Sequence, residues 1–265
     1  ISAFNSYHGS THGSLSLLGS DNQKIGYGPM LPKVKFIRFN NENDLKKITK
    51  KTACVLLETI QGGAGFIVPD LNYLKKVKSK CDSMGALLIL DEIQPGFGRT
   101  GRFFGFEHFD VKPDIIVMGK GMGGGLPIGA FSSSRKLMKN FQDKPKLGHI
   151  TTFGGNPVIA AASLATLREL RDSNLISQID KKEALFRKEL KHPKIIEIRG
   201  KGLMLAAIVE NEEMVDMIIE MCIKKRVLLF RLLWEKKALR ISPPLTISEK
   251  EIKKGCNIIR EVLNN

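Results

Sequence analysis

The stretch ALLILDE (residues 86–92) is an unbroken apolar run that ends in two carboxylates. TACVLLET (52–59) and DIIVMG (114–119) repeat the pattern, and strand-like and helical segments alternate along most of the chain. Continuous apolar strands are typical of a sheet covered on both faces, since a strand with one wet face alternates apolar and polar residues. The pattern predicts an α/β fold with a mostly parallel central sheet and helices on both faces.

The segment after Pro69 predicts a helix between the first two strands, and Gly85 is the expected end of that helix. Its apolar residues recur at helical spacing and share one face: Leu71, Leu74, Val77 and Cys81. That face is expected to pack against the sheet.

The sequence from Asn156 onward predicts more helix and a second set of strands. Asn156 is a helix cap and Pro157 occupies the first helical position. IIEIRGKGLMLAAIVE (195–210) predicts two short strands around a glycine turn, and VLLF and LRIS predict two more. The capping box Ser248-x-x-Glu251 opens the last helix.

These patterns predict two domains, a large one over residues 1–172 and a smaller C-terminal α/β domain over residues 173–265. Ile1 begins in strand-like sequence without an initiating Met. We therefore expect a fragment whose large domain is incomplete at its N-terminus.

The charge of the chain does not by itself indicate a nucleic-acid partner. The 265 residues carry a formal net charge of +15, but the lysines are dispersed along the polar sides of amphipathic helices, as in LKKVKSK. No platform of interleaved aromatic and basic residues is present. We expect no nucleic acid and, with no apolar run near the roughly 20 residues of a bilayer span, no membrane.

The four cysteines, Cys54, Cys81, Cys222 and Cys256, are far apart and form no CxxC pair. That spacing favours neither a metal site nor a disulfide framework. We expect reduced core thiols in a cytoplasmic protein that binds no metal.

Polar side chains follow each of the three apolar runs: Glu58, the pair Asp91 and Glu92, and Lys120. Ligands of open α/β sheets bind beyond the carboxyl ends of the strands, so these groups are candidates for one site. A Walker B strand also ends in Asp-Glu, but nucleotide hydrolysis needs a G-x-x-x-x-G-K-[ST] loop, which the chain does not contain. That alternative requires a loop upstream of Ile1.

Lys120 lies between two glycines in GKGMGGG (119–125). A lysine that forms a Schiff base needs space and a lowered pKa, and flanking glycines allow a cofactor to approach the backbone. If the carbonyl belongs to pyridoxal phosphate, the pyridine nitrogen needs a buried carboxylate to stay protonated. Asp91, at the end of a neighbouring strand, is the candidate for that carboxylate.

At these residues the chain resembles the class III (subgroup II) aminotransferases, pyridoxal-phosphate enzymes of fold type I. The group includes acetylornithine, ornithine, 4-aminobutyrate and other ω-amino acid aminotransferases. LILDEIQPGFGRTGRFFGFEHFDVKPDIIVMGKGMGGGLPIGAF (88–131) is similar to the family signature almost throughout. YHGSTHG (7–13), TTFGGNP (151–157) and LRISPPLTIS (239–248) resemble three further blocks. The likeness covers essentially the whole chain, without the family's N-terminal phosphate loop.

The resemblance implies a role for each matched residue around pyridoxal 5′-phosphate. Lys120 would be the Schiff-base lysine and proton shuttle, and Asp91 would bind the pyridine nitrogen. Ile93 and Tyr7 would pack on opposite faces of the ring. Gln94 would hydrogen-bond near its phenolic oxygen.

Four further residues complete the implied site. Glu58 would lie near Asp91 and Gln94, and His8 belongs to the block that stacks on the ring. Thr152 resembles a threonine that reaches the cofactor phosphate of a partner subunit, which implies a homodimer with shared active sites. Arg240 matches an arginine that binds the α-carboxylate of the substrate.

The implied reaction moves an amino group from an amino acid or ω-amino donor to a 2-oxo acid such as 2-oxoglutarate. Two departures bear on the donor: Ser10 stands where acetylornithine- and ornithine-type enzymes usually have Arg, and Gly63 stands where they tend to have Glu. In the family that glutamate masks the arginine that corresponds to Arg240. We expect a donor range different from, or broader than, acetylornithine.

Two other functions remain open at this point. One is another use of the same cofactor and fold, as in an aminomutase or a decarboxylase. The other is a non-catalytic fragment, whose affinity for the cofactor is too low without the phosphate loop.

Overall fold

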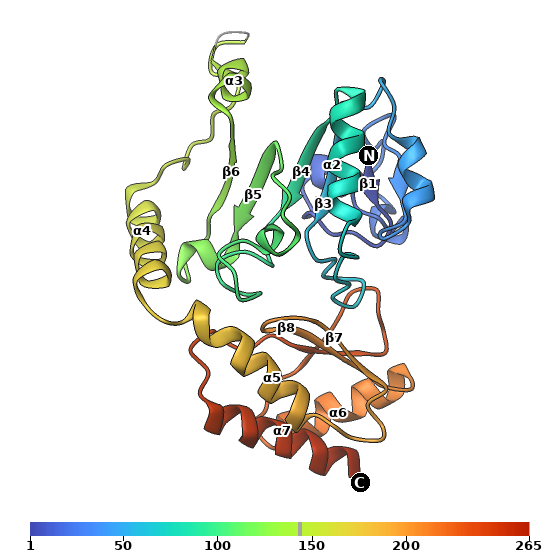
Figure 1. The fold of residues 1–265 in the computed structure, drawn as a ribbon, viewed down its shortest axis with the longest axis vertical. Coiled ribbons are helices and arrows are strands. Elements are labelled where there is room, and N and C mark those ends of the chain that lie inside the picture. The colour runs from blue at the N-terminus through green and yellow to red at the C-terminus, as the bar shows by residue number, and fades with distance from the viewer. Residues whose placement is uncertain (143–144, 265) are drawn as a thin grey trace.

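The computed structural model describes residues 1–142 and 145–264 (Figure 1). Its strands are β1 (Ser2–Ala3), β2 (Phe36–Ile37), β3 (Cys54–Glu58), β4 (Leu87–Asp91), β5 (Ile115–Gly119), β6 (Gly129–Ser133), β7 (Glu197–Lys201), β8 (Met204–Ile208), β9 (Phe230–Arg231) and β10 (Ala238–Ile241). Its α-helices are α1 (His12–Ser16), α2 (Tyr73–Met84), α3 (Arg135–Met138), α4 (Pro157–Asp172), α5 (Ile179–Glu189), α6 (Glu212–Lys224) and α7 (Glu249–Asn264).

The central sheet has the strand order β3-β4-β5-β6. β3, β4 and β5 run parallel, and β6 runs antiparallel to β5. Glu58 lies opposite Asp91 in this register, and Asp91 lies opposite Val117. The carboxyl ends of the three parallel strands therefore meet at one edge of the sheet, where β5 leads into Lys120. The predicted α/β class and mostly parallel sheet are confirmed.

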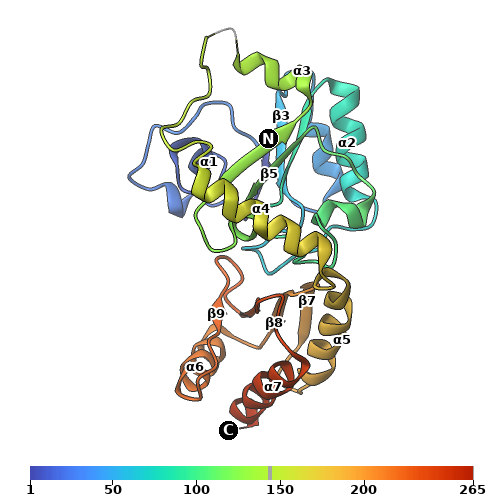
Figure 2. The same cartoon turned by 90° about the vertical axis from the view of Figure 1, so that its left-hand side faces the viewer.

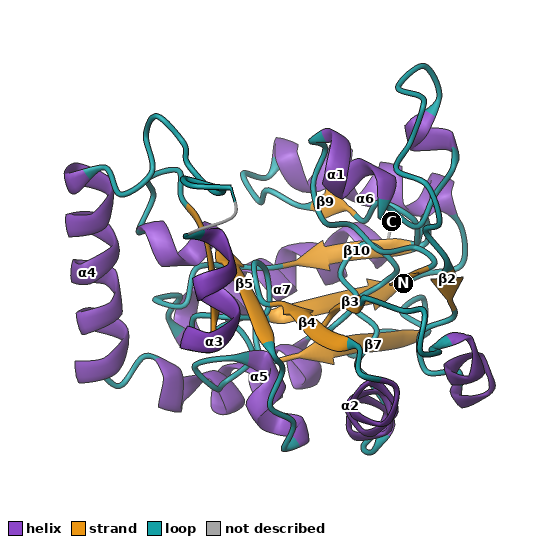
Figure 3. Cartoon of the chain, turned by 90° about the horizontal axis from the view of Figure 1, so that it is seen from above, coloured by secondary structure: helices purple, strands orange, loops and turns teal. Residues whose placement is uncertain are grey.

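Helix α2 packs on one face of this sheet, and α4 lies beyond its β6 side (Figures 1 and 3). Leu74, Val77 and Cys81 of α2 are fully buried in a cluster with the alternate residues of β3 and β4. Gly85 ends the helix with φ of +73°, in the left-handed region that glycine adopts at little cost.

Leu71 does not belong to the buried face of α2, so that part of the expectation is wrong. The helix begins at Tyr73, whose amide donates to the carbonyl of Asp70 (2.9 Å), and Leu71 lies in the turn before it, 75% exposed. Tyr73 fills the buried position instead.

The C-terminal part is an antiparallel sheet of order β7-β8-β10-β9 with α5, α6 and α7 on one side (Figures 1 and 2). An apolar cluster of eighteen buried residues, all between Ile179 and Leu263, holds the helices to the strands. The expected strand pair in 195–210 is present as β7 and β8, whereas Phe230 alone of VLLF (227–230) joins β9.

The expected capping box opens α7. The amide and hydroxyl of Ser248 donate to the Glu251 carboxylate (2.8 and 2.7 Å), and the Glu251 amide donates to the Ser248 hydroxyl (3.2 Å). These bonds satisfy donors that would otherwise lack partners at the helix start.

A third apolar cluster joins the two parts of the chain. Ile60 and Phe66 of the first part pack against residues of β8 and β10. Two backbone hydrogen bonds also join the two parts, from Leu203 N–H to the carbonyl of Arg99 (2.9 Å) and from Trp234 N–H to the carbonyl of Gly63 (2.8 Å). The division into domains 1–172 and 173–265 stays a prediction, and the separate clusters on either side favour it.

The described residues include no helix long and apolar enough to cross a membrane, and no cluster of three potential metal ligands. The four cysteines are unpaired; Cys54 is half-buried and the other three are buried. The cytoplasmic location stays a prediction.

Candidate active site

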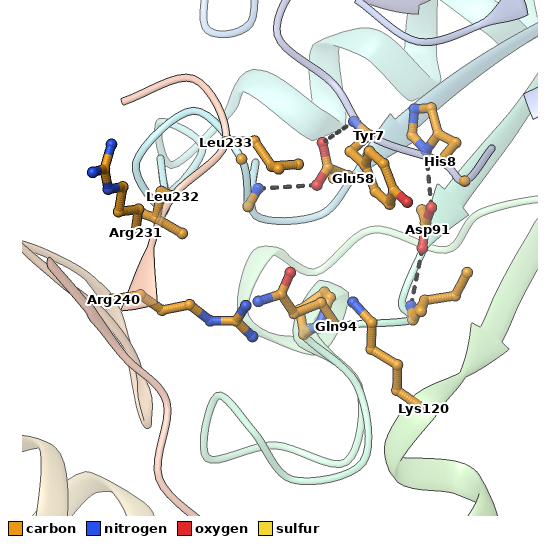
Figure 4. A pocket seen from close by; sticks show the side chains of 15 residues that line it. Tyr7, His8, Glu58, Asp91, Gln94, Lys120, Arg231, Leu232, Leu233 and Arg240 are labelled. Atoms are coloured by element: carbon orange, nitrogen blue, oxygen red, sulfur yellow. Dashed lines mark hydrogen bonds and ion pairs between the residues drawn. The ribbon is translucent and has the colours of Figure 1, made fainter. Parts of the chain in front are cut away.

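A cavity of about 380 Å³ opens at the carboxyl ends of β3, β4 and β5, opposite the β9–β10 segment (Figure 4). Eight of the nine predicted site residues line it: Tyr7, His8, Glu58, Asp91, Ile93, Gln94, Lys120 and Arg240. The ninth, Thr152, lies outside this cavity on an exposed segment. Gly62, Gly63 and the run Arg231–Leu233 complete much of the wall.

Asp91 is held from two sides at the base of the cavity. Its Oδ2 lies 2.8 Å from Nδ1 of His8, and its Oδ1 accepts a hydrogen bond from the amide of Ile93 (3.0 Å). The His8 side chain is 3% exposed, and its Nε2 has no partner among the described residues. His8 thus orients the carboxylate through which Asp91 faces the cavity.

Glu58 is a second buried carboxyl beside Asp91. It accepts hydrogen bonds from the amides of Gly62 (3.0 Å) and Tyr7 (3.2 Å). Burial raises its pKa to about 7, and the charge of Asp91 adds to the rise, while His8 and the two amides oppose it. Glu58 therefore ties the YHGSTHG segment to the loop after β3.

Glu92 does not face the cavity, so the expected pair Asp91 and Glu92 contributes only one carboxylate. Glu92 is fully buried on the other side of the strand end, where it accepts from the Thr59 hydroxyl and from the amides of Gly105 (2.7 Å) and Phe106 (2.9 Å). Successive residues of an extended chain point to opposite faces, which is why adjacent carboxylates separate here.

Lys120 follows β5 directly and adopts a left-handed backbone, with φ of +42°. Its amine extends toward Arg240 and Gln94 in Figure 4. Burial among the cavity walls lowers the pKa of Lys120 and the charge of Arg240 lowers it further, while Asp91 and Glu58 oppose the change. A larger share of the amine is therefore neutral, as a nucleophile requires.

The glycines around Lys120 have structural reasons of their own. A Cβ on Gly119 would lie 3.1 Å from the carbonyl oxygen of Ile128 on the neighbouring segment. Gly124 has φ of +59°, and a Cβ there would collide with the hydroxyl of Thr166 on α4. Gly119 thus allows the close approach of the segment before β6, and Gly124 allows that of α4. That the glycines on either side of Lys120 also leave space for a cofactor stays a prediction.

Arg240 reaches the cavity from β10. Its Nε donates to the hydroxyl of Ser242 (3.2 Å), and no carboxylate of the described chain pairs with it. Burial lowers its pKa. Arg99 lies close enough for the Arg240 charge to add to the burial that lowers the pKa of Arg99 to about 10.

The sequence profile of the aminotransferase class-III family matches residues 1–263. The chain belongs to the class-III aminotransferase family. It is similar to the acetylornithine aminotransferase of Caldanaerobacter subterraneus subsp. tengcongensis. The two sequences are 38% identical, and the match covers 100% of this class-III chain and 67% of the relative.

Solved structures agree with the family assignment. The ornithine aminotransferase of Toxoplasma gondii ME49 superposes with a TM-score of 0.92 at 30% identity, over 99% of this class-III chain and 64% of that one. A second structure of the Toxoplasma gondii enzyme, with a TM-score of 0.90 at 30% identity over 98% and 62% of the two chains, is described as having PLP at partial occupancy in its active site. The chain thus spans about two thirds, or slightly less, of the length of these relatives.

The two buried carboxyls predict a pH dependence of stability. Burial raises the pKa of both Glu58 and Glu92 from 4.5 to about 7. The folded chain then binds more protons than the unfolded chain between these values, so stability falls as pH rises from about 4.5 to about 7. The slope is at most about 1.4 kcal/mol per pH unit for each carboxyl.

Urea unfolding of wild type and Glu92→Gln at pH 5, 6 and 7 measures the share of Glu92. The unfolding free energy of the variant should increase relative to that of wild type as pH rises, because glutamine has no proton to lose. A difference in unfolding free energy that is constant across this range would contradict the assignment.

Proposed function

We propose that the protein is a pyridoxal-phosphate-dependent aminotransferase that moves an amino group from an amino acid donor to a 2-oxo acid such as 2-oxoglutarate. The observation that carries the proposal is the convergence of Lys120, Asp91 and Arg240 on one cavity, from β5, β4 and β10. These three groups offer a nucleophilic amine, a buried carboxylate and a guanidinium for a substrate carboxylate.

The donor set of the cavity fits pyridoxal 5′-phosphate. When bound, this cofactor supplies an aldehyde that condenses with amines and a protonated ring that accepts electrons from the donor carbon. Asp91, oriented by His8 at 2.8 Å, would receive the ring N–H, and Lys120 would hold the aldehyde carbon. Tyr7 and Ile93 both line the cavity and would flank the ring, with Gln94 near its oxygen.

The protein's own part in the reaction is proton movement and binding. Lys120, with its lowered pKa, would take the proton from the donor carbon and deliver it to the cofactor. Arg240 would fix the substrate carboxylate through paired N–H groups. Glu58 would keep Tyr7 in position through the 3.2 Å bond to its amide.

A homodimer with shared active sites is part of the proposal. Thr152 lies on an exposed segment whose apolar neighbours are also exposed: Leu147, Ile150, Phe153 and Val158. An exposed apolar group of this kind favours coverage by another protein surface. Thr152 would then reach the cofactor phosphate of the partner subunit.

A labelled donor tests the reaction type. Full-length enzyme with pyridoxal phosphate, an amino acid labelled with ¹⁵N and unlabelled 2-oxoglutarate should yield ¹⁵N-glutamate and the 2-oxo acid of the donor in equal amounts. Carbon dioxide release, or an isomer of the donor that retains its nitrogen, would instead favour a decarboxylase or an aminomutase. Absence of any product from the full-length enzyme would contradict the proposed function.

A further inference from the structure

Lys120 and Arg240 face one cavity from different parts of the chain. Lys120 follows β5 of the first part, and Arg240 belongs to β10 of the C-terminal part (Figure 4). Both residues also line a neighbouring cavity of about 800 Å³, and Arg99 lines it with them. The position of the guanidinium of Arg240 relative to the amine therefore depends on how the two parts are joined. A misplacement of about 1 Å at a reacting centre can cost about 100-fold in rate.

The loop 96–101 (GFGRTG) of the first part lies directly against the turn between β7 and β8. Leu203 in that turn donates its N–H to the carbonyl of Arg99 (2.9 Å). Gly202 has φ of +62°, and a Cβ on it would lie 2.5 Å from the same carbonyl oxygen and 2.6 Å from Cα of Thr100. The two backbones are thus in contact, and a side chain at position 202 would separate them.

The side chain of Arg99 extends from this loop into the C-terminal part. Its Nη1 donates to the carbonyls of Leu203 (3.3 Å) and Pro243. Within the described part of the chain, no carboxylate pairs with this guanidinium. Burial and the charge of Arg240 lower the pKa of Arg99 to about 10, so the side chain stays charged near neutral pH. Arg99 is therefore a cation that anchors two backbone carbonyls across the junction.

The Pro243 carbonyl lies close to Arg240 along the chain, on the segment that leaves β10. Between them, the hydroxyl of Ser242 accepts a hydrogen bond from Nε of Arg240 (3.2 Å). The rings of Pro243 and Pro244 restrict the backbone at consecutive positions, which leaves this segment little freedom. Anchoring the Pro243 carbonyl therefore also restrains the hydroxyl that holds Arg240.

A second buried cation anchors the same segment from within the C-terminal part. Lys182 of α5 is 6% exposed, and its amine donates to the carbonyl of Leu245 (2.6 Å). Arg99 supplies the matching connection to the first part. The segment after β10 is thus held by a cation from each part of the chain.

We propose that Arg99 is a positioning residue, which holds the segment after β10 against the first part and thereby fixes the guanidinium of Arg240 relative to Lys120. Arg99 would touch neither substrate nor cofactor. The inference rests on the proposed aminotransferase function, in which Arg240 binds the carboxylate of the substrate. Loss of the anchor would let the segment move, so substrate carboxylates would bind less tightly while the chemistry at Lys120 continues.

Steady-state kinetics of the full-length holoenzyme, with 2-oxoglutarate as the varied substrate, test this role. Arg99→Met removes both hydrogen bonds to carbonyls and keeps an unbranched side chain. KM should rise about tenfold, because the contact between Arg240 and the carboxylate is misplaced. Since Lys120 is unchanged, kcat should fall by less than about threefold. A lower kcat with unchanged KM, or no change in either, would overturn the proposal.

Arg99→Lys shows whether the hydrogen bonds carry the effect. Lysine retains a donor at nearly the same reach, so its KM should lie at least about threefold below that of Arg99→Met. A KM no lower than that of Arg99→Met would count against the anchor.

Arg187→Met is the matched control. Arg187 also donates to two backbone carbonyls, those of Ile198 (2.6 Å) and Gly200 (2.8 Å), but both lie within the C-terminal part and Arg187 does not line the cavity. Its KM and kcat should equal those of wild type, even where its unfolding midpoint falls as far as that of Arg99→Met. A rise in KM equal to that of Arg99→Met would reduce the effect to general stability and contradict the proposal.

A double-mutant cycle tests whether Arg99 acts through Arg240. Arg99→Met should lower kcat/KM for 2-oxoglutarate about tenfold when Arg240 is present, but less than about twofold in Arg240→Met, because coupled residues are not additive. An equal loss in both backgrounds would mean that Arg99 acts on the substrate by its own charge, and it would overturn the positioning role.

Binding of propionate, an unreactive carboxylate, provides a readout that needs no turnover. Calorimetric titration of the holoenzyme should show about tenfold weaker binding to Arg99→Met than to wild type or Arg187→Met. Equal affinity for all three would contradict the proposal. Failure of the aminotransferase function itself would differ, since wild type would then form no glutamate, whatever its affinity for propionate.

Discussion

Lys120→Arg is expected to lower kcat for transamination by at least about 10⁴-fold, because both the nucleophilic amine and the proton carrier are lost. Arginine keeps the positive charge and most of the length of the side chain. Its guanidinium stays protonated near neutral pH and does not condense with an aldehyde. Steady-state production of glutamate from 2-oxoglutarate by the purified full-length variant measures the loss.

Lys112→Arg is the matched control, because Lys112 is exposed just before β5 and does not line the cavity. It should retain wild-type kcat. Far-UV circular dichroism and unfolding midpoints close to wild type would show that Lys120→Arg is folded. A folded Lys120→Arg enzyme with more than a tenth of wild-type kcat would contradict the role given to Lys120.

Asp91→Asn is expected to lower kcat by about 10²–10³-fold, which is typical for removal of one preorganised electrostatic partner. Asparagine keeps the shape and a hydrogen bond to the Ile93 amide, but it removes the negative charge that would keep the ring nitrogen protonated. The absorption spectrum of the bound cofactor should shift with the variant, because the spectrum reports the protonation of the ring.

Two further variants serve as comparisons for Asp91→Asn. Asp110→Asn changes an exposed carboxylate that pairs with Lys75 and should leave kcat and spectrum unchanged. His8→Gln should give a smaller loss than Asp91→Asn, since it removes only the 2.8 Å partner that orients the carboxylate. An Asp91→Asn enzyme with an unaltered spectrum and kcat would exclude Asp91 as the partner of the ring.

Much of the site could be predicted, because several of its residues follow directly from the ends of predicted strands. Apolar runs mark β3, β4 and β5, and parallel strands place their carboxyl ends at one edge, which brings Glu58, Asp91 and Lys120 together. The same reasoning placed the Glu92 carboxylate in the site with that of Asp91, and this prediction is wrong. Alternation along an extended chain was the available signal, and it sends Glu92 to the Thr59 side.

The part of the cavity wall around Gly63 and Arg231 could not be predicted from local pattern. Gly63 and Trp234 are far apart in the chain and meet only where the two parts pack, through a backbone bond of 2.8 Å. The sequence shows that Gly63 lacks a side chain, but not that the Trp234 indole fills the space beside it. Arg231 likewise appears free in the sequence, and only the fold of α6 pairs it with Glu212 and Asp216.

The site of cofactor attachment tests the central claim most directly. Full-length enzyme is loaded with pyridoxal phosphate, reduced with borohydride, digested and mapped by mass spectrometry. The account predicts one phosphopyridoxyl group, on Nζ of Lys120, in the peptide that contains GKGMGGG, and none in Lys120→Arg. A phosphopyridoxyl group on another lysine, or none on wild-type full-length enzyme, would contradict it.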